Sequence, residues 1–222
     1  MRSFDDILAI SAERKGGFGA VLDDITPPLD RQRLAAIPDD RWLSMMTKCV
    51  FQAGFNWKVI ENKWDGFEEA FHGFDVGRCA MMNDEWFDEL VSDRRIVRNA
   101  QKIETVQKNA VFVSDSASTA GGFGAFIADW PDEDYVGLIQ LLKSQGARLG
   151  GVTGQYFLRT MGKDSFILSR DVVARLIAEG VIDKSPTSKR ALASVQSAFN
   201  DWREQSGKSF NVISRVLAQS IG

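Results

Sequence analysis

The 222-residue sequence is poor in the residues that build disulfide frameworks, metal sites and membrane spans. It has two cysteines, Cys49 and Cys79, and one histidine, His72. This count excludes a disulfide framework and argues against a four-ligand zinc site, and a reduced, cytoplasmic setting is the simpler interpretation. No run reaches the roughly 18–20 apolar residues needed to cross a bilayer. The N-terminal segment mixes acidic with apolar residues, unlike a signal peptide. We expect a soluble protein with no membrane association.

The sequence also has no excess of positive charge. Its 27 Lys and Arg against 30 Asp and Glu give a formal net charge of −3. This balance argues against a large electrostatic footprint for nucleic acid, although a small local one remains open. The rest of the composition, 44% hydrophobic and 26% charged, is that of an ordinary globular protein.

Alternating strand patterns are lacking, and hydrophobic residues recur at helical spacing along almost the whole chain. The spacing predicts an all-α protein and a first helix ending near Gly16. It also predicts a loop over 17–30, an amphipathic helix from Pro38 to Gly54 and a long helix over 93–112. The small, polar segment 113–124 is predicted as a linker between lobes 1–112 and 125–222 of one domain, 1–222. Further helices are expected at 57–63, 66–72, 125–129, 134–145, 151–161, 169–179, 187–205 and 209–219.

Three motifs follow in order between residues 50 and 110: Gln52-Ala53-Gly54 with Trp57, then Phe71-His72-Gly73-Phe74-Asp75, then Ile96-Val97-Arg98-Asn99 with Lys102-Ile103. In order and spacing they resemble the 3-methyladenine DNA glycosylase I family of the helix-hairpin-helix DNA glycosylase superfamily. The likeness continues more weakly to about residue 162. It implies a helical bundle with two lobes around a cleft. It also implies a monomer that hydrolyses the N-glycosidic bond of alkylated adenine in double-stranded DNA, the first step of base excision repair.

A flipped base needs a flat aromatic face and polar groups that read its edge. The resemblance implies that Trp57 stacks on the base, while Gln52 and Asn56 supply polar contacts. Phe18, between glycines in "GGFGAV", is a further candidate on a mobile loop. The alternative is that Trp57 belongs to the core and the two amides only satisfy groups of their own loop.

The glycine-rich stretch "RLGGVTGQYFLRTMG" resembles the hairpin of the superfamily. Glycines let backbone amides approach a phosphate, and a helix N-terminus favours negative charge. Gly150, Gly151, Thr153 and Gly154 are therefore candidates for DNA-backbone contacts. An ordinary turn between helices is the alternative.

Basic side chains could extend this contact. Arg148 and Arg159 flank the hairpin, and Arg98 and Lys102, four residues apart, are expected to share one face of the long helix. For each of them a solvated surface position is the alternative.

Two departures from the family concern residues that it uses. Cys49 stands where the family has a Glu that points into the pocket, and a neutral thiol cannot stabilise positive charge as a carboxylate does. Cys49 can equally be a small buried hydrophobe, since it lies on the apolar face of its helix. The family's zinc ligands are missing, so no zinc or other cofactor is expected. The helices over 187–219 are expected to tie the chain ends together instead.

The remaining expectations concern catalysis. Gln155 stands near the position of the lysine that lyases carry, which implies a monofunctional, hydrolytic mechanism. After the hairpin, other superfamily members hold an Asp. One register places Ser169 there, and another places Asp171, which could stabilise the developing positive charge or activate water. Alternatively, Ser169 and Asp171 only stabilise a helix start. Glu61 is a reserve acid.

Two other functions remain open on this sequence. The loss of the family Glu favours a DNA- or lesion-binding protein that kept the fold and lost turnover. The acidic net charge favours a helical scaffold with no DNA role.

Overall fold

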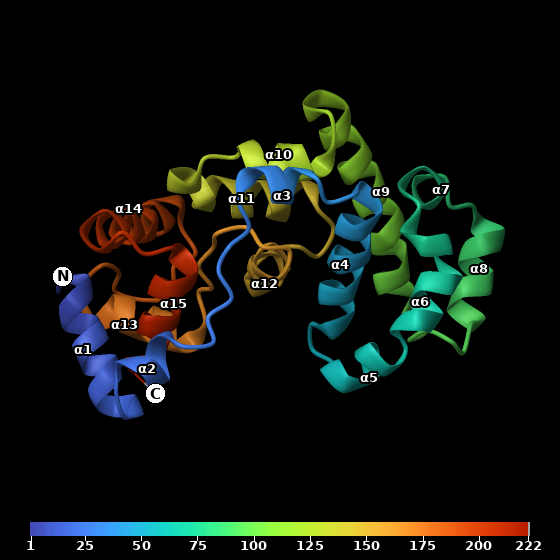
Figure 1. Cartoon of the computed structure of the whole chain (residues 1–222). Coiled ribbons are helices and arrows are strands. Elements are labelled where there is room, and N and C mark those ends of the chain that lie inside the picture. Colours follow the sequence, from blue (N-terminus) through green and yellow to red (C-terminus); the bar gives the residue numbers. More distant parts are fainter. Residues whose placement is uncertain (222) are drawn as a thin grey trace. The chain divides into compact units, whose positions relative to one another are not determined.

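The computed structural model describes residues 1–221, and this range contains helices and no strand (Figure 1). The predicted all-α class is therefore confirmed. The elements are α1 (Phe4–Lys15), α2 (Phe18–Leu22), α3 (Arg31–Ala35), α4 (Asp39–Gln52), α5 (Trp57–Asn62), α6 (Trp64–Ala70), η1 (His72–Phe74), α7 (Val76–Ala80), α8 (Asp84–Ser92), α9 (Ala100–Ala120), α10 (Phe123–Asp129), η2 (Asp132–Asp134), α11 (Tyr135–Gln145), α12 (Val152–Thr160), α13 (Arg170–Ala178), α14 (Lys189–Ser206) and α15 (Phe210–Gln219).

The chain divides into two compact units whose boundaries differ from the predicted lobes. Unit 1 combines Met1–Leu29, Pro131–Leu138 and Leu158–Gly222, and unit 2 combines Asp30–Trp130 with Ile139–Phe157. The N-terminal segment thus joins the C-terminal helices in unit 1. A division at one linker misses this because contacts between distant parts of the chain decide which segments pack together.

The predicted linker over 113–124 is mostly helix, which corrects the expectation. Helix α9 runs from Ala100 to Ala120 and ends at Gly121, which has a left-handed φ of 79° and donates its N–H to Ala117 O. Ser and Thr in its last turns bond back to carbonyls one turn earlier, as Ser118 Oγ does to Asp115 O at 2.7 Å. The small, polar residues of this segment therefore continue the helix, and the glycine pair Gly121-Gly122 ends it.

The start of α9 also differs from the prediction. Asn99 caps the helix by accepting the N–H of Lys102 at 3.1 Å, so the segment 93–99 precedes the helix. Arg98 and Lys102 consequently do not share a helix face. The predicted loop at 17–30 contains one more short helix, α2.

Unit 2 is held by an aromatic core between α4, α6, η1 and α9. Trp64, Phe67, Phe71 and Phe74 form a stacked series, in which Trp64 and Phe74 have ring centroids 5.7 Å apart at 8°. Aromatic pairs in such offset arrangements add to the burial energy of each ring. The core fixes the C-terminal end of α4, from which the candidate site begins.

Unit 1 has its own aromatic core and ties the chain ends together. Phe166 and Phe199 stack with centroids 4.0 Å apart. Ser11 Oγ of α1 donates to Val216 O of α15 at 2.7 Å, and Trp202 Nε1 of α14 donates to Arg2 O at 3.1 Å. The expectation that the C-terminal helices hold the chain ends is confirmed.

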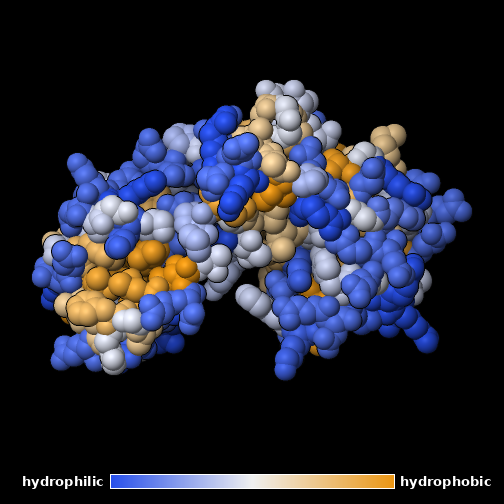
Figure 2. Space-filling model, viewed as in Figure 1, coloured by the Kyte–Doolittle hydropathy of each residue, from blue (hydrophilic) through white to orange (hydrophobic). Residues whose placement is uncertain are grey.

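In the described part of the chain, no helix is long and apolar enough to cross a bilayer. On the face shown in Figure 2, hydrophilic side chains cover α5 to α8, and hydrophobic atoms gather over the part of unit 1 that carries α13 and α15.

Candidate functional site

The turn between α4 and α5 presents Trp57 at the surface of unit 2. Helix α4 ends at Gln52, and Gly54 turns the chain with a left-handed φ of 70°. Asn56 then caps α5 by accepting the N–H of Lys58 at 3.0 Å. Trp57 is the first residue of α5, and 51% of its side chain is exposed. Trp57 is therefore not the core residue that the alternative interpretation of this motif had proposed.

The two amides of this turn have different surroundings. The Asn56 side-chain oxygen is used by the helix cap, as the alternative interpretation expected. The Gln52 side chain is half-buried at the end of α4. Of the two amides, only Asn56 takes part in the helix cap, so the polar atoms of the Gln52 side chain are the ones available to a ligand.

Trp57 lies next to the helix that follows the glycine hairpin. Its ring meets Tyr156 of α12 edge-to-face, with centroids 5.8 Å apart at 88°. Tyr156 is itself 38% exposed, and Phe55 and Val152 of the same two segments are also exposed. The indole and the hairpin, 93 or more residues apart in sequence, are thus brought together within unit 2.

Tyr156 and Phe55 were not among the predicted site residues. Phe55 stands between Gly54 and Asn56, inside the motif that named Trp57. In the sequence, the available signal for Tyr156 was an aromatic residue two positions after Gly154. Its contact with Trp57 required the structure.

The hairpin has the geometry of a tight turn pinned to α9. Ala147 donates its N–H to Asn109 Oδ1 at 2.7 Å and accepts from Asn109 Nδ2 at 3.2 Å. Gly151 has a left-handed φ of 61°, and a Cβ at Gly154 would collide with the carbonyl oxygen of Leu149. Both positions therefore require glycine for backbone reasons. Gly150 and Thr153, half-buried beside them, remain candidates for phosphate contacts.

Lys102 was predicted to contact the DNA backbone, and the structure contradicts this. Only 8% of the residue is exposed, and its Nζ donates to Phe51 O at 3.1 Å and Ala53 O at 2.8 Å. Burial, and then the charge of Arg148, lower the pKa of Lys102. The ammonium thus closes the C-terminal end of α4 and holds the turn that leads to Trp57.

The other predicted basic contacts differ among themselves. Arg98 and Arg148 are exposed in unit 2, and Arg148 donates to Gln101 Oε1 at 2.7 Å. Arg159 belongs to unit 1 and is half-buried, with Nε donating to Ser165 Oγ at 2.9 Å and Nη2 donating to Ser165 O. The DNA-backbone contact predicted for Arg159 stays a prediction, and the part of its guanidinium that carries Nε and Nη2 binds a neighbouring loop of its own unit.

Cys49 is buried, with 8% of the residue exposed. Burial raises the pKa of its thiol to about 12. The side chain is consequently neutral at physiological pH and cannot supply the negative charge of a carboxylate at this position.

Asp171 and Phe18 belong to unit 1 and are exposed. Ser169 is the N-cap of α13 and accepts the N–H of Val172 at 3.3 Å, while Asp171 lies in the first turn. This is the helix-start geometry of the alternative interpretation. Within residues 1–221, no three His, Cys, Asp or Glu side chains cluster as a metal site would require.

A sequence model of the methyladenine glycosylase family matches residues 35–145, half of the chain. The chain belongs to the methyladenine glycosylase family. The match covers α4, the turn with Trp57 and α9, and it ends before the hairpin.

Two relatives and one solved structure extend this comparison. DNA-3-methyladenine glycosylase 1 of Escherichia coli (strain K12) is 36% identical over 59 residues, which is 27% of this chain and 32% of that protein. DNA-3-methyladenine glycosylase of Haemophilus influenzae (strain ATCC 51907 / DSM 11121 / KW20 / Rd) is 28% identical over 130 residues, which is 50% of this chain and 70% of that protein. The alignment with the E. coli protein thus spans about a third of that protein's length.

The structure of Methanocaldococcus jannaschii 8-oxoguanine glycosylase/lyase in complex with DNA is similar in fold, with a TM-score of 0.51 at 14% identity. The likeness covers 96% of this chain and 95% of the other. A DNA glycosylase fold therefore extends over both units of the methyladenine glycosylase family member described here.

Proposed function

We propose that this family member is a monofunctional DNA glycosylase that excises 3-methyladenine from double-stranded DNA in base excision repair, working as a cytoplasmic monomer. Family membership and the names of the two relatives support the activity. The exposed Trp57 beside the hairpin helix is the observation that carries the proposal for this chain.

The arrangement suits base flipping. An alkylated adenine rotated out of the duplex would stack on the exposed indole of Trp57, with Gln52 close to the base edge. The hairpin amides at 150–154 would hold the phosphate backbone, which positions DNA without reading its sequence. One unit would thus supply both the stacking face and the backbone contact.

The chemistry needs little help from an acid, because an alkylated adenine is a cation and a good leaving group. Water adds to the sugar C1′, the N-glycosidic bond breaks, and the neutral base leaves with the bonding electrons, while the attacking water loses one proton to solvent and becomes the C1′ hydroxyl. Cys49, as a neutral thiol, adds no electrostatic stabilisation to this step. Asp171 lies in the first turn of α13 in unit 1, and its role in stabilising a sugar cation or activating water stays a prediction from the resemblance. With Gln155 at the lyase position, no Schiff base forms at that position.

The test is excision of 3-methyladenine from alkylated duplex DNA by wild-type and Trp57→Ala protein. Loss of a stacking contact of about 1–3 kcal/mol should lower kcat/KM by about 5- to 150-fold. Trp86→Ala is the matched control, since Trp86 is a half-buried tryptophan of α8 that packs under Arg78 in the same unit. Equal losses in both variants would remove Trp57 from the pocket.

A second function, binding of damaged DNA without turnover, is favoured by the neutral thiol at Cys49. It predicts salt-dependent duplex binding by the wild type with no released base. The excision assay and a binding assay on the same DNA separate the two functions.

A further inference from the structure

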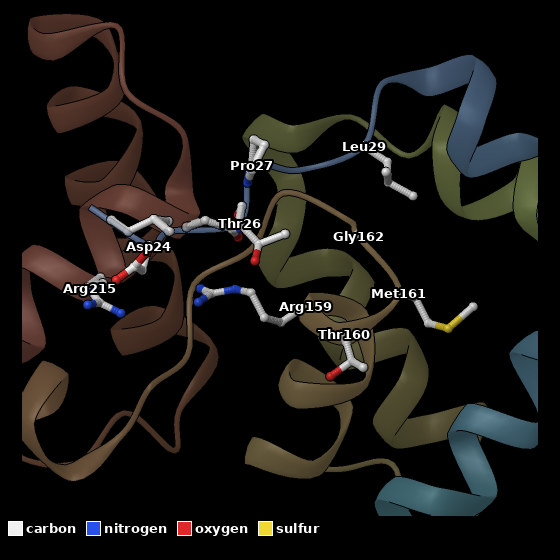
Figure 3. Close-up of a pocket in the computed structure, with 11 residues that line it drawn as sticks. Asp24, Thr26, Pro27, Leu29, Arg159, Thr160, Met161, Gly162 and Arg215 are labelled. Carbon is white, nitrogen blue, oxygen red and sulfur yellow. The ribbon is translucent and has the colours of Figure 1, made fainter. Parts of the chain in front are cut away.

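Unit 1 contains a pocket of about 420 Å³, formed by the segment 24–29, the end of α12 with the following loop, and α15 (Figure 3). This volume lies in the range of small-molecule sites, roughly 300–1,000 Å³. Neither the family match, which ends at residue 145, nor the proposed base pocket at Trp57 involves this hollow.

Two guanidinium groups point into the pocket from opposite sides. Figure 3 shows Arg215 of α15 and Arg159 of α12 extending toward each other across the hollow. Arg215 donates Nε–H to Val21 O at 3.1 Å, and Arg159 donates Nε–H to Ser165 Oγ at 2.9 Å. Both side chains are thereby held in place before any ligand arrives.

Arg215 lacks a charge partner of its own. It is half-buried, and no carboxylate in residues 1–221 lies within ion-pair distance of its guanidinium. Figure 3 shows the carboxylate of Asp24 turned toward it. The remaining N–H groups of this guanidinium can donate to an anion that enters the pocket.

The rest of the lining is neutral. Thr26 and Thr160 bring hydroxyl groups, and the buried Asn211 fixes the loop by donating Nδ2–H to Thr26 O at 3.4 Å. Pro27 and Met161 add apolar walls. Arg159, Arg215 and Asp24 are the charged residues of the lining.

We infer that this pocket binds a phosphoryl group, held by the guanidinium groups of Arg215 and Arg159 with the hydroxyls of Thr26 and Thr160. Planar guanidinium groups recognise phosphate through paired, charge-assisted hydrogen bonds. The apolar walls leave room for the group that carries the phosphate. This inference does not depend on the proposed excision activity.

The test compares thermal unfolding with inorganic phosphate and with chloride at equal ionic strength. If the Kd for phosphate is about 1 mM, roughly 20 mM phosphate should raise the Tm of the wild type by about 5 °C. Arg215→Gln should lose this shift. Arg190→Gln removes the same charge from an exposed position of α14 outside the pocket and should keep the shift.

A second variant distinguishes loss of phosphate binding from a folding defect in Arg215→Gln. Thr26→Glu places a carboxylate in front of the arginines from an exposed position, and it should abolish the phosphate shift without lowering the Tm in chloride. A wild-type shift no larger than that of Arg215→Gln would overturn the inference, because phosphate would then act on the whole surface.

Two further arms identify the source of the phosphate. Tighter binding of adenosine 5′-monophosphate than of inorganic phosphate, lost in Arg215→Gln, assigns the pocket to free nucleotides. A weaker affinity of Arg215→Gln for undamaged duplex DNA, with Arg190→Gln unchanged, assigns it to the DNA backbone. If Arg215→Gln binds all three ligands as the wild type does, the pocket is not a phosphate site.

Discussion

Replacing Lys102 by methionine tests how the Trp57 turn is held. The change keeps a long side chain in α9 and removes the ammonium that donates to Phe51 O at 3.1 Å and Ala53 O at 2.8 Å. Hydrogen bonds from a charged donor contribute about 1.5–3 kcal/mol each. The desolvation of the ammonium offsets part of this hydrogen-bond energy. Burial lowers the pKa of Lys102, which indicates that the folded protein solvates the charge less well than water does.

The expected net effect of Lys102→Met is a loss of about 2 kcal/mol in the free energy of unfolding, measured by urea denaturation. Excision should also fall, since the released turn no longer presents Trp57 in one position. Lys108→Met is the matched control in the same helix, where the lysine makes an exposed ion pair with Glu104 at 2.8 Å. Such a pair contributes less than about 1 kcal/mol. If the two variants unfold at the same urea concentration, Lys102 does not hold the turn.

Three further predictions concern Cys49, Gly151 and Glu68 of unit 2. Cys49→Glu places a carboxyl group where burial raises the thiol pKa to about 12. Burial should likewise raise the pKa of the introduced carboxyl, so any gain in excision should grow as the pH rises and the carboxylate forms, and a pH-independent loss would contradict a pocket position. Gly151→Ala puts alanine at a positive φ of 61° and should lower the free energy of unfolding by about 1 kcal/mol. Gly180→Ala, at a φ of 71°, is the matched control and should cost about the same. Only Gly151→Ala should weaken duplex binding. Burial alone would raise the pKa of Glu68, but hydrogen bonds from Arg41, Ser44 and Trp64 outweigh burial, and the net pKa is lowered. The ionised Glu68 therefore stabilises the fold, and this contribution is lost as the pH falls below about 4.5. Glu68→Gln should make the free energy of unfolding decline less steeply at acid pH.

The fold was largely predictable because its signals are local. The helix after Pro38 and the glycine stop at Gly16 follow from periodicity and from backbone freedom at glycine. The prediction of a linker at 113–124 was wrong, because a helix can contain small polar residues when its apolar face is buried. The division into units was wrong because it depends on packing between distant segments.

The candidate site was predictable only in part. Trp57 and the hairpin glycines stand out as motifs, and the burial of Cys49 follows from its place on the apolar face of α4. The role of Lys102 could not be read, because a lysine is ordinarily exposed and its partners lie about 50 residues away. The same holds for Tyr156, whose contact with Trp57 joins two distant segments.

The central claim, that the Trp57 indole stacks on a flipped alkylated base, is tested most directly by single-turnover release of 3-methyladenine from duplex DNA. Wild type, Trp57→Phe and Trp57→Ala should release the base at rates that fall in this order, since phenylalanine keeps a smaller aromatic face. Equal rates in all three proteins would contradict the claim.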